Sequence, residues 1–169
     1  MRRAIRVRHL LLLVLVALAA CDEGLGPPAS PPVPPGVLAG TVRFFHWDSA
    51  GPTLDIRLVA FRVFPPGDII AEVLQGRAVV HPPVGGPPLV TGTPDSADVL
   101  LTLPAGEYPY VVVAQQFGPV MTTDWRAVGQ YDLDSNLTSP SPVLILPGDT
   151  TRGIDIIVDF TRIPPPPAQ

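Results

Sequence analysis

The chain has 169 residues, among them 24 prolines and 15 glycines, and a formal net charge of −4. Residues 1–20 hold four of its eleven arginines, so the remainder carries seven arginines against fifteen acidic residues, a net charge of −8. An acidic surface repels phosphate backbones, which excludes nucleic acid as an expected partner. Proline and glycine this frequent also exclude long helices, and we expect an all-β chain.

The first 20 residues have the layout of a secretory signal peptide. A basic segment with four arginines in residues 2–8 precedes an apolar run, residues 10–20, that closes on small residues. This run is about half of the roughly 20 residues that a transmembrane helix needs. The acidic pair Asp22 and Glu23 follows it. We therefore expect a cleaved signal helix rather than a permanent membrane span.

The end of this segment, Leu18, Ala19, Ala20 and Cys21, resembles a lipobox, the motif at which bacterial lipoproteins receive a diacylglyceryl group and lose their signal. Cys21 is the only cysteine, so it has no partner for the disulfides that exported proteins usually form. The resemblance implies diacylglycerol and acyl chains on Cys21, and a place in the bacterial cell envelope facing the periplasm or cell surface. Two or three acyl chains anchor stably, whereas one binds only marginally.

Proline-rich stretches flank a single predicted domain. Residues 22–36 read DEGLGPPASPPVPPG and show no apolar period. In polyproline geometry they extend over about 45 Å. We expect a lipidated, proline-rich tether over residues 21–36 and a proline-rich tail over residues 164–169. Residues 37–163, between them, have the length of one domain.

Within this domain the apolar residues recur every second position. In residues 153–161, Ile154, Ile156, Val158 and Phe160 share one face, which predicts a half-buried strand. Six or seven short strands without a helix between them favour an antiparallel sandwich. Residues 108–116 and 143–146 are apolar on both faces and predict central strands; residues 37–47, 54–64 and 97–103 predict three more.

Residues 65–94 are rich in proline and glycine, with short apolar pieces at 68–74 and 77–80. Proline cannot donate a hydrogen bond to a β-ladder, so it belongs at sheet edges and in loops. We expect one or two edge strands and a long irregular loop here.

Two segments carry motifs beyond simple alternation. Residues 99–113 read as a strand, a Pro-Ala-Gly turn and a strand that opens on a tyrosine. Pro104 presets φ at the first turn position, and Gly106 can take the positive φ that a tight return requires. The second segment is LPGDT, residues 146–150, which leads into a strand at residues 153–156.

These segments resemble the carboxypeptidase regulatory-like, or transthyretin-like (prealbumin-like), β-sandwich domains of many bacterial surface lipoproteins. With strands at residues 40–42 and 58–61, the resemblance covers nearly all of residues 37–161. It implies a seven-stranded antiparallel sandwich, or one of six to eight strands. Residues 65–94 replace the family's compact link between its second and third strands. Such domains serve as spacers, adhesive modules, carbohydrate binders and accessory domains without a shared active site.

One loop offers candidate metal ligands. Asp132, Asp134 and Asn136 place oxygen side chains at alternate positions, as calcium-binding turns do. A complete EF-hand loop would need glycine in place of Leu137 and glutamate in place of Val143. We therefore expect an Asx-type turn that satisfies its own backbone, with a calcium site as the alternative.

Aromatic residues offer candidate ligand-stacking groups. Strand alternation puts Phe45 and Trp47 on the same, more polar face, with rings about 7 Å apart. Together with Trp125 they form a candidate surface for sugar rings. The alternative is that a neighbouring loop, such as residues 65–94, covers the pair.

Catalytic motifs are missing from the sequence. After loss of the signal, His46 and His81 are the histidines that remain, and neither lies in a nucleophile or metal motif. We expect no catalysis, with a hydrolase as the most distant alternative, and no cofactor beyond the lipid. The leading hypothesis is a lipid-anchored interaction domain with an unknown envelope partner. The alternative is a carbohydrate-binding module, calcium-assisted or not.

Overall fold

The computed structural model describes residues 31–134 and 136–167. The predicted signal peptide, the lipobox with Cys21 and most of the predicted tether lie outside these residues. Residues Val33–Gln169 belong to one compact unit. In the part of the chain that is described, no helix is long and apolar enough to cross a membrane.

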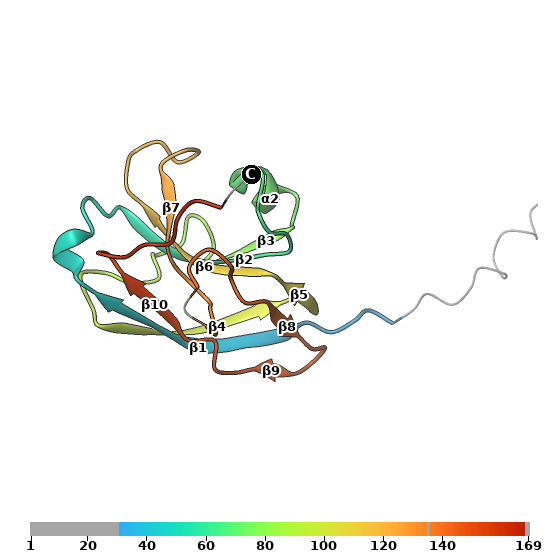
Figure 1. The fold of residues 1–169 in the computed structure, drawn as a ribbon. Helices are drawn as coiled ribbons and strands as arrows, with labels where there is room; N and C mark the ends of the chain where they lie inside the picture. Colours follow the sequence, from blue (N-terminus) through green and yellow to red (C-terminus); the bar gives the residue numbers. More distant parts are fainter. Residues whose placement is uncertain (1–30, 135, 168–169) are drawn as a thin grey trace, which may run out of the picture. The chain divides into compact units, whose positions relative to one another are not determined.

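Two sheets lie face to face, and a short ribbon adjoins them (Figure 1). The first has the order β10-β1-β4, with β9 beside β1. The second has the order β3-β2-β6-β7, and the ribbon is the pair β5-β8. The strands are β1 (Gly36–Phe45), β2 (Asp55–Phe61), β3 (Ala78–His81), β4 (Ser96–Leu103), β5 (Gly106–Tyr108), β6 (Tyr110–Gln116), β7 (Trp125–Gln130), β8 (Val143–Ile145), β9 (Thr150–Thr151) and β10 (Ile156–Asp159), with the helical elements η1 (Trp47–Ser49) and α2 (Ile69–Leu74).

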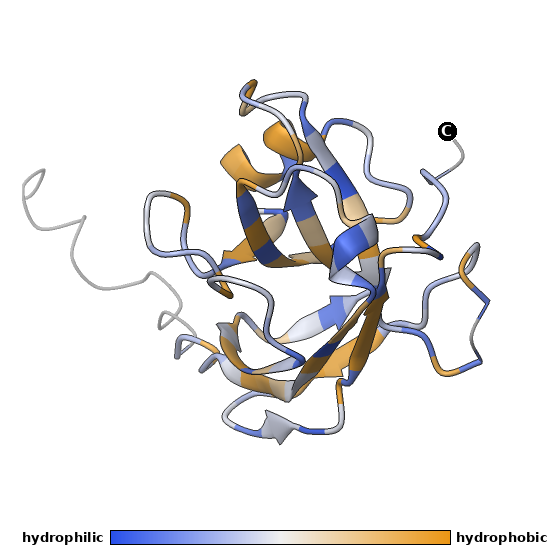
Figure 2. Ribbon diagram, turned by 90° about the vertical axis from the view of Figure 1, so that its left-hand side faces the viewer, coloured by the Kyte–Doolittle hydropathy of each residue, from blue (hydrophilic) through white to orange (hydrophobic). Residues whose placement is uncertain are grey.

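The predicted all-β class is confirmed, and alternation along the strands builds the main core between the two sheets. The hydropathy colouring in Figure 2 alternates accordingly along the strands. The face predicted for residues 153–161 is correct, because Ile154, Ile156, Val158 and Phe160 are all buried.

The prediction of uniformly antiparallel pairing is wrong for the final strand. β10 pairs in parallel with β1, with Val42 opposite Ile156, and β9 also runs parallel to β1. Antiparallel pairing follows from a short hairpin connection. Here nearly the whole domain separates β1 from β10 in sequence, so no such connection fixes their relative direction.

The second sheet is apolar on both faces. Val111 and Val113 of β6 point into the main core, whereas Tyr110 and Val112 belong to a second cluster with Phe61 on the opposite face. Val73 of α2 packs against this second cluster. The prediction of a central strand in residues 108–116 is therefore confirmed for β6.

The similar prediction for residues 143–146 is wrong. Among the described residues β8 pairs only with β5, and Leu144 and Leu146 are about half exposed. Four apolar residues in a row also fit a short edge ribbon that buries alternate side chains, in this case Val143 and Ile145.

Residues 65–94 contain one edge strand, as predicted, and one helix that was not predicted. β3 pairs with β2 at the edge of the second sheet. The helix α2 begins after Asp68, whose side chain accepts hydrogen bonds from the backbone N–H groups of Ile70 and Ala71. Its six residues are too few for a helical period to show in the sequence.

The Pro-Ala-Gly turn between β4 and β5 has the expected conformation, with Gly106 at φ 138°. The hydroxyl of Tyr108 donates to the carbonyl oxygen of Pro104 over 2.9 Å. Arg62 donates to the same hydroxyl over 3.0 Å and lies over the Tyr108 ring at 4.7 Å. Burial raises the pKa of Tyr108, so the hydroxyl keeps its proton for this bond. The turn is thus held by Tyr108 of β5 and by Arg62, which directly follows β2.

We predict that Gly40→Ala strongly destabilises the domain. A Cβ at position 40 would lie 2.0 Å from the backbone oxygen of Ile154, where only backbone movement can make room. The expected loss in free energy of unfolding is about 3 kcal/mol, measured by chemical denaturation. Thr102→Ala, on the exposed face of β4, serves as the control and should change stability by less than about 0.5 kcal/mol. Equal stability of the two variants would contradict the close approach of Gly40 to the backbone of Ile154.

Candidate functional site

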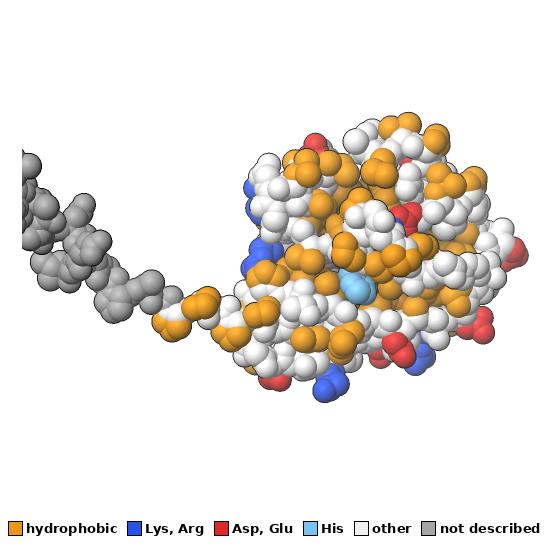
Figure 3. All heavy atoms as spheres, turned by 180° about the vertical axis from the view of Figure 1, so that it is seen from behind, with side chains coloured by type: hydrophobic (Ala, Val, Ile, Leu, Met, Phe, Trp, Pro, Cys, Tyr) orange, Lys and Arg blue, Asp and Glu red, His pale blue; other side chains and the backbone are white. Residues whose placement is uncertain are grey.

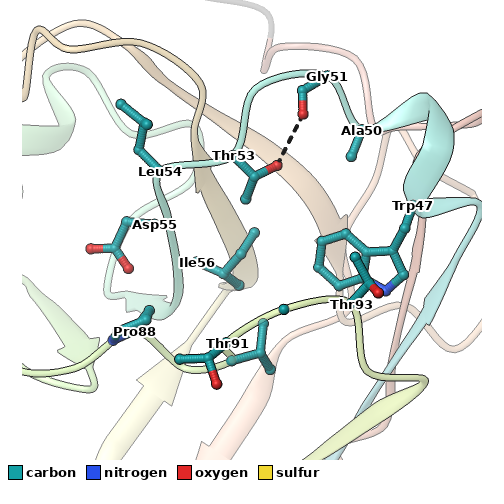
Figure 4. A pocket seen from close by; sticks show the side chains of 12 residues that line it. Trp47, Ala50, Gly51, Thr53, Leu54, Asp55, Ile56, Pro88, Thr91 and Thr93 are labelled. Carbon is teal, nitrogen blue, oxygen red and sulfur yellow. Dashed lines mark hydrogen bonds between the residues drawn. The ribbon is translucent and has the colours of Figure 1, made fainter.

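A hollow of about 460 Å³ opens between the β1–β2 connection and the loop that precedes β4 (Figure 4). The indole of Trp47 and the side chain of Ile56 supply apolar lining. Thr53, Thr91 and Thr93 supply hydroxyl groups from the two facing loops. Its volume lies in the range of small-molecule sites in proteins.

The side chain of Arg57 holds the loop that leads into one wall of this hollow, which begins at Pro88. Arg57 lies on β2 and is only 4% exposed. Its Nη1 lies within 3.0 Å of the carbonyl oxygens of Pro82, Pro83 and Pro87, and its Nη2 donates to that of Gly86 over 2.8 Å. One buried guanidinium therefore fixes the backbone of residues 82–87.

Asp55 balances the charge of Arg57. Its Oδ2 accepts from Nε of Arg57 over 2.8 Å and lies 2.7 Å from Nη2. Buried charges persist in proteins when they are paired and hydrogen-bonded in this way. Asp55 also lines the hollow, and because its charge is matched by Arg57 it adds little net charge there.

The opposite wall is held by Gln115, which is fully buried on β6. Its Nε2 donates to the carbonyl oxygen of Ala50 over 3.1 Å and to Oγ1 of Thr53 over 2.5 Å. Its Oε1 accepts from Nε of Arg126 over 2.8 Å, and Arg126 also donates to Ala50. Both walls therefore rest on polar side chains of the second sheet.

Trp47 occupies a place that strand alternation does not predict. β1 ends at Phe45, and His46 takes a left-handed conformation with φ 60°. The indole then lies between Phe44 and Phe160, with centroid distances of 4.9 and 4.7 Å. Its Nε1 donates to the carbonyl oxygen of Pro94 over 2.8 Å. Phe45 and Trp47 therefore do not form the predicted pair on one strand face.

Trp125 is not brought to the hollow either. It opens β7, and its Nε1 donates to the backbone oxygen of Met121 over 2.9 Å. It is not among the residues that line the hollow. Of the three predicted stacking residues, only Trp47 lines it.

The loop with the candidate calcium ligands forms the expected Asx-type turns. Oδ1 of Asp132, Asp134 and Asn136 each accept a hydrogen bond from the backbone N–H two residues further on, over 3.0, 2.9 and 3.2 Å. Among the described residues, no group of three or more His, Cys, Asp or Glu side chains is placed to hold a metal ion.

Both histidines of the domain lie away from the hollow lining. His46 Nδ1 is 2.8 Å from Oδ1 of Asp159. Hydrogen bonds from Thr161, and then from His46, lower the pKa of Asp159 to about 2. Burial, and secondarily the charge of Arg57, lowers the pKa of His81. His81 is therefore neutral at neutral pH and adds no positive charge beside the hollow.

Sequence reasoning did not identify Arg57 or Gln115. A signal for Arg57 is present, because residues 54–64 are apolar apart from Asp55, Arg57 and Arg62. Two opposite charges two positions apart share one face of a strand, which indicates an ion pair on a buried strand. Gln115 has no comparable signal, since its partners are Arg126 on another strand and a loop 62 to 65 residues away.

Comparison with protein-family models, with curated proteins and with solved structures gives no match to this chain.

We predict that Arg57→Met destabilises the domain by about 3–5 kcal/mol, since it leaves the carboxylate of Asp55 and four loop carbonyls without their donor. Chemical denaturation measures the loss. Arg43→Met, on the exposed face of β1, is the matched control and should change stability by less than about 0.5 kcal/mol. If Arg57→Met were as mild as Arg43→Met, the role of Arg57 in holding the loop would be disproved.

Proposed function

We propose that this chain is a lipid-anchored, non-catalytic protein of the bacterial cell envelope that displays its β-sandwich as a binding domain. The observation that carries the proposal is the sequence Leu18-Ala19-Ala20-Cys21 after a basic and apolar start. The proline-rich residues 22–36 that follow provide a spacer between a lipidated cysteine and a folded domain.

The fold supports a kinship with carboxypeptidase regulatory-like, prealbumin-like domains. Two sheets that lie face to face, β10-β1-β4 with β9 beside β1 and β3-β2-β6-β7, support the sandwich part of this kinship. The Pro104-to-Gly106 turn, with its tyrosine, lies between β4 and β6 as the resemblance expects.

The surface favours binding through apolar and hydrogen-bonding contacts. On the face shown in Figure 3, hydrophobic side chains gather over the middle and most charged side chains lie toward the edge. A binding domain of this character fits an uncharged glycan or peptide surface better than a polyanion.

We predict that Cys21→Ala abolishes membrane attachment. Without the thiol there is no atom to carry the lipid, so the protein should no longer incorporate labelled palmitate and should move from the membrane to the soluble fraction. Ser30→Ala, within the same proline-rich stretch, is the control and should stay labelled and membrane-bound. A Cys21→Ala form that is still processed at the same site and still sediments with membranes would refute the anchor without bearing on the domain.

A second candidate function is carbohydrate binding, and the hollow beside Trp47 favours it. The Trp47 indole, packed between Phe44 and Phe160, supplies an apolar edge to the hollow. Beside it the hydroxyls of Thr91 and Thr93 supply hydrogen-bonding groups, and sugars bind in proteins through this combination of apolar and polar contacts. No basic side chain lines the hollow among the described residues, so the matching glycan is neutral.

We predict that Thr91→Ala with Thr93→Ala reduces binding to neutral glycans at least tenfold on an array of bacterial envelope polysaccharides. Both side chains are exposed, so the double variant should keep its melting temperature. Thr102→Ala, an exposed threonine on β4, is the control. Unchanged glycan binding in the double variant, or no binding by the parent protein, would exclude a carbohydrate site in this hollow.

A further inference from the structure

The proline-rich tail lies over a second hollow, on the outer face of the second sheet. Ile163 packs against the main core and Pro164 is buried, which anchors the start of the tail. Pro165, Pro166 and Pro167 then form one wall of a hollow of about 240 Å³.

The floor of this hollow is aromatic. Phe64 and Tyr110 lie with their ring centroids 5.0 Å apart, and Tyr110 continues to Phe61 at 5.7 Å. Phe64 is 37% exposed. Grooves lined by aromatic rings are the surfaces that bind polyproline II segments, because proline rings pack flat against them.

A hydrogen-bond donor at this hollow has no partner. Gln130 is 6% exposed, and its Nε2 is buried with no hydrogen-bond partner among the described residues. Gln130 lines the hollow together with Tyr110. Burial raises the pKa of Tyr110 to about 12, so its hydroxyl is protonated. A polyproline II segment has carbonyl oxygens without internal partners, which are the acceptors that such donors require.

The tail fills this hollow, which forms a groove beside Phe64 and Tyr110, only in part. Its described residues leave about 240 Å³ unfilled and do not reach Nε2 of Gln130, although an unpaired buried donor is unfavourable. A proline-rich segment that filled the space and placed a carbonyl oxygen at Gln130 would bind more favourably than the tail does.

We propose that the groove of Phe64, Tyr110 and Gln130 is a polyproline-binding site, occupied in cis by the tail, and that its ligand in trans is the proline-rich stretch 27–35 of a second copy. That stretch, PPASPPVPP, offers three Pro-Pro pairs. The binding site itself does not depend on the lipid anchor. The binding of one copy's proline-rich stretch by another copy, the exchange between copies, rests on the proposed lipidation, which places the tethers and domains of many copies in one layer above a membrane.

The test uses the soluble chain that starts at Asp22, with and without residues 165–169. A fluorescent peptide of residues 27–36 is titrated and its anisotropy recorded. We expect the shortened chain to bind the peptide at least tenfold more tightly than the full chain, because the competing tail is gone. In the shortened chain, Gln130→Met should weaken binding about tenfold, and Thr102→Ala, the control, should not.

A peptide in which alanine replaces every proline should not bind. Binding of a tail peptide, residues 161–169, without binding of peptide 27–36 would overturn the exchange between copies, because the groove would then serve only its own tail. Binding of neither peptide to a folded, shortened chain would overturn the polyproline site itself. Neither outcome bears on the lipid anchor, which the palmitate label tests separately.

Discussion

The structure depends on the buried guanidinium of Arg57. The backbone from Pro82 to Pro88 contains four prolines, which have no N–H group and so cannot donate backbone hydrogen bonds. Their carbonyl oxygens still need donors, and Arg57 supplies them to four residues while Asp55 neutralises its charge. One side chain of the second sheet thus fixes the first part of the connection from β3 to β4, which leads into one wall of the hollow.

The second sheet is covered on both faces, and this explains the positions of α2 and the proline-rich tail. A two-sheet sandwich leaves one face of each sheet to solvent, yet Phe61, Tyr110 and Val112 are buried on the outer face of this one. The covering comes from α2 on one part of the face and from the proline tail near Tyr110. The insert at residues 65–94 and the tail are therefore parts of the domain's packing.

Local patterns in the sequence predict much of this fold because they have local causes. The buried face of β10, the central position of β6 and the positive φ of Gly106 follow from alternation, from apolar residues on both faces and from the Pro-Ala-Gly motif. The parallel pairing of β10, the placement of Trp47 and the contacts of Gln115 depend on residues far away in sequence. The left-handed His46 is an example, because one residue in that conformation turns the next ring from the outer face of the strand to a half-buried position against the core.

The carbonyl oxygens of proline-rich segments need hydrogen-bond donors from other parts of the chain, and the two such segments of the domain differ in whether nearby donors are used. At residues 82–87 the loop carbonyl oxygens accept hydrogen bonds from Arg57, so the guanidinium N–H groups are used in holding the loop. At the tail, the described structure leaves the donor of Gln130 unused beside two aromatic rings and an unfilled hollow. Since unused buried donors are costly, the groove is the place where a further proline-rich segment gains most on binding. Donation of hydrogen bonds to proline-rich backbone thus holds the insert in place, and it is also the basis on which the groove at the tail would bind a ligand.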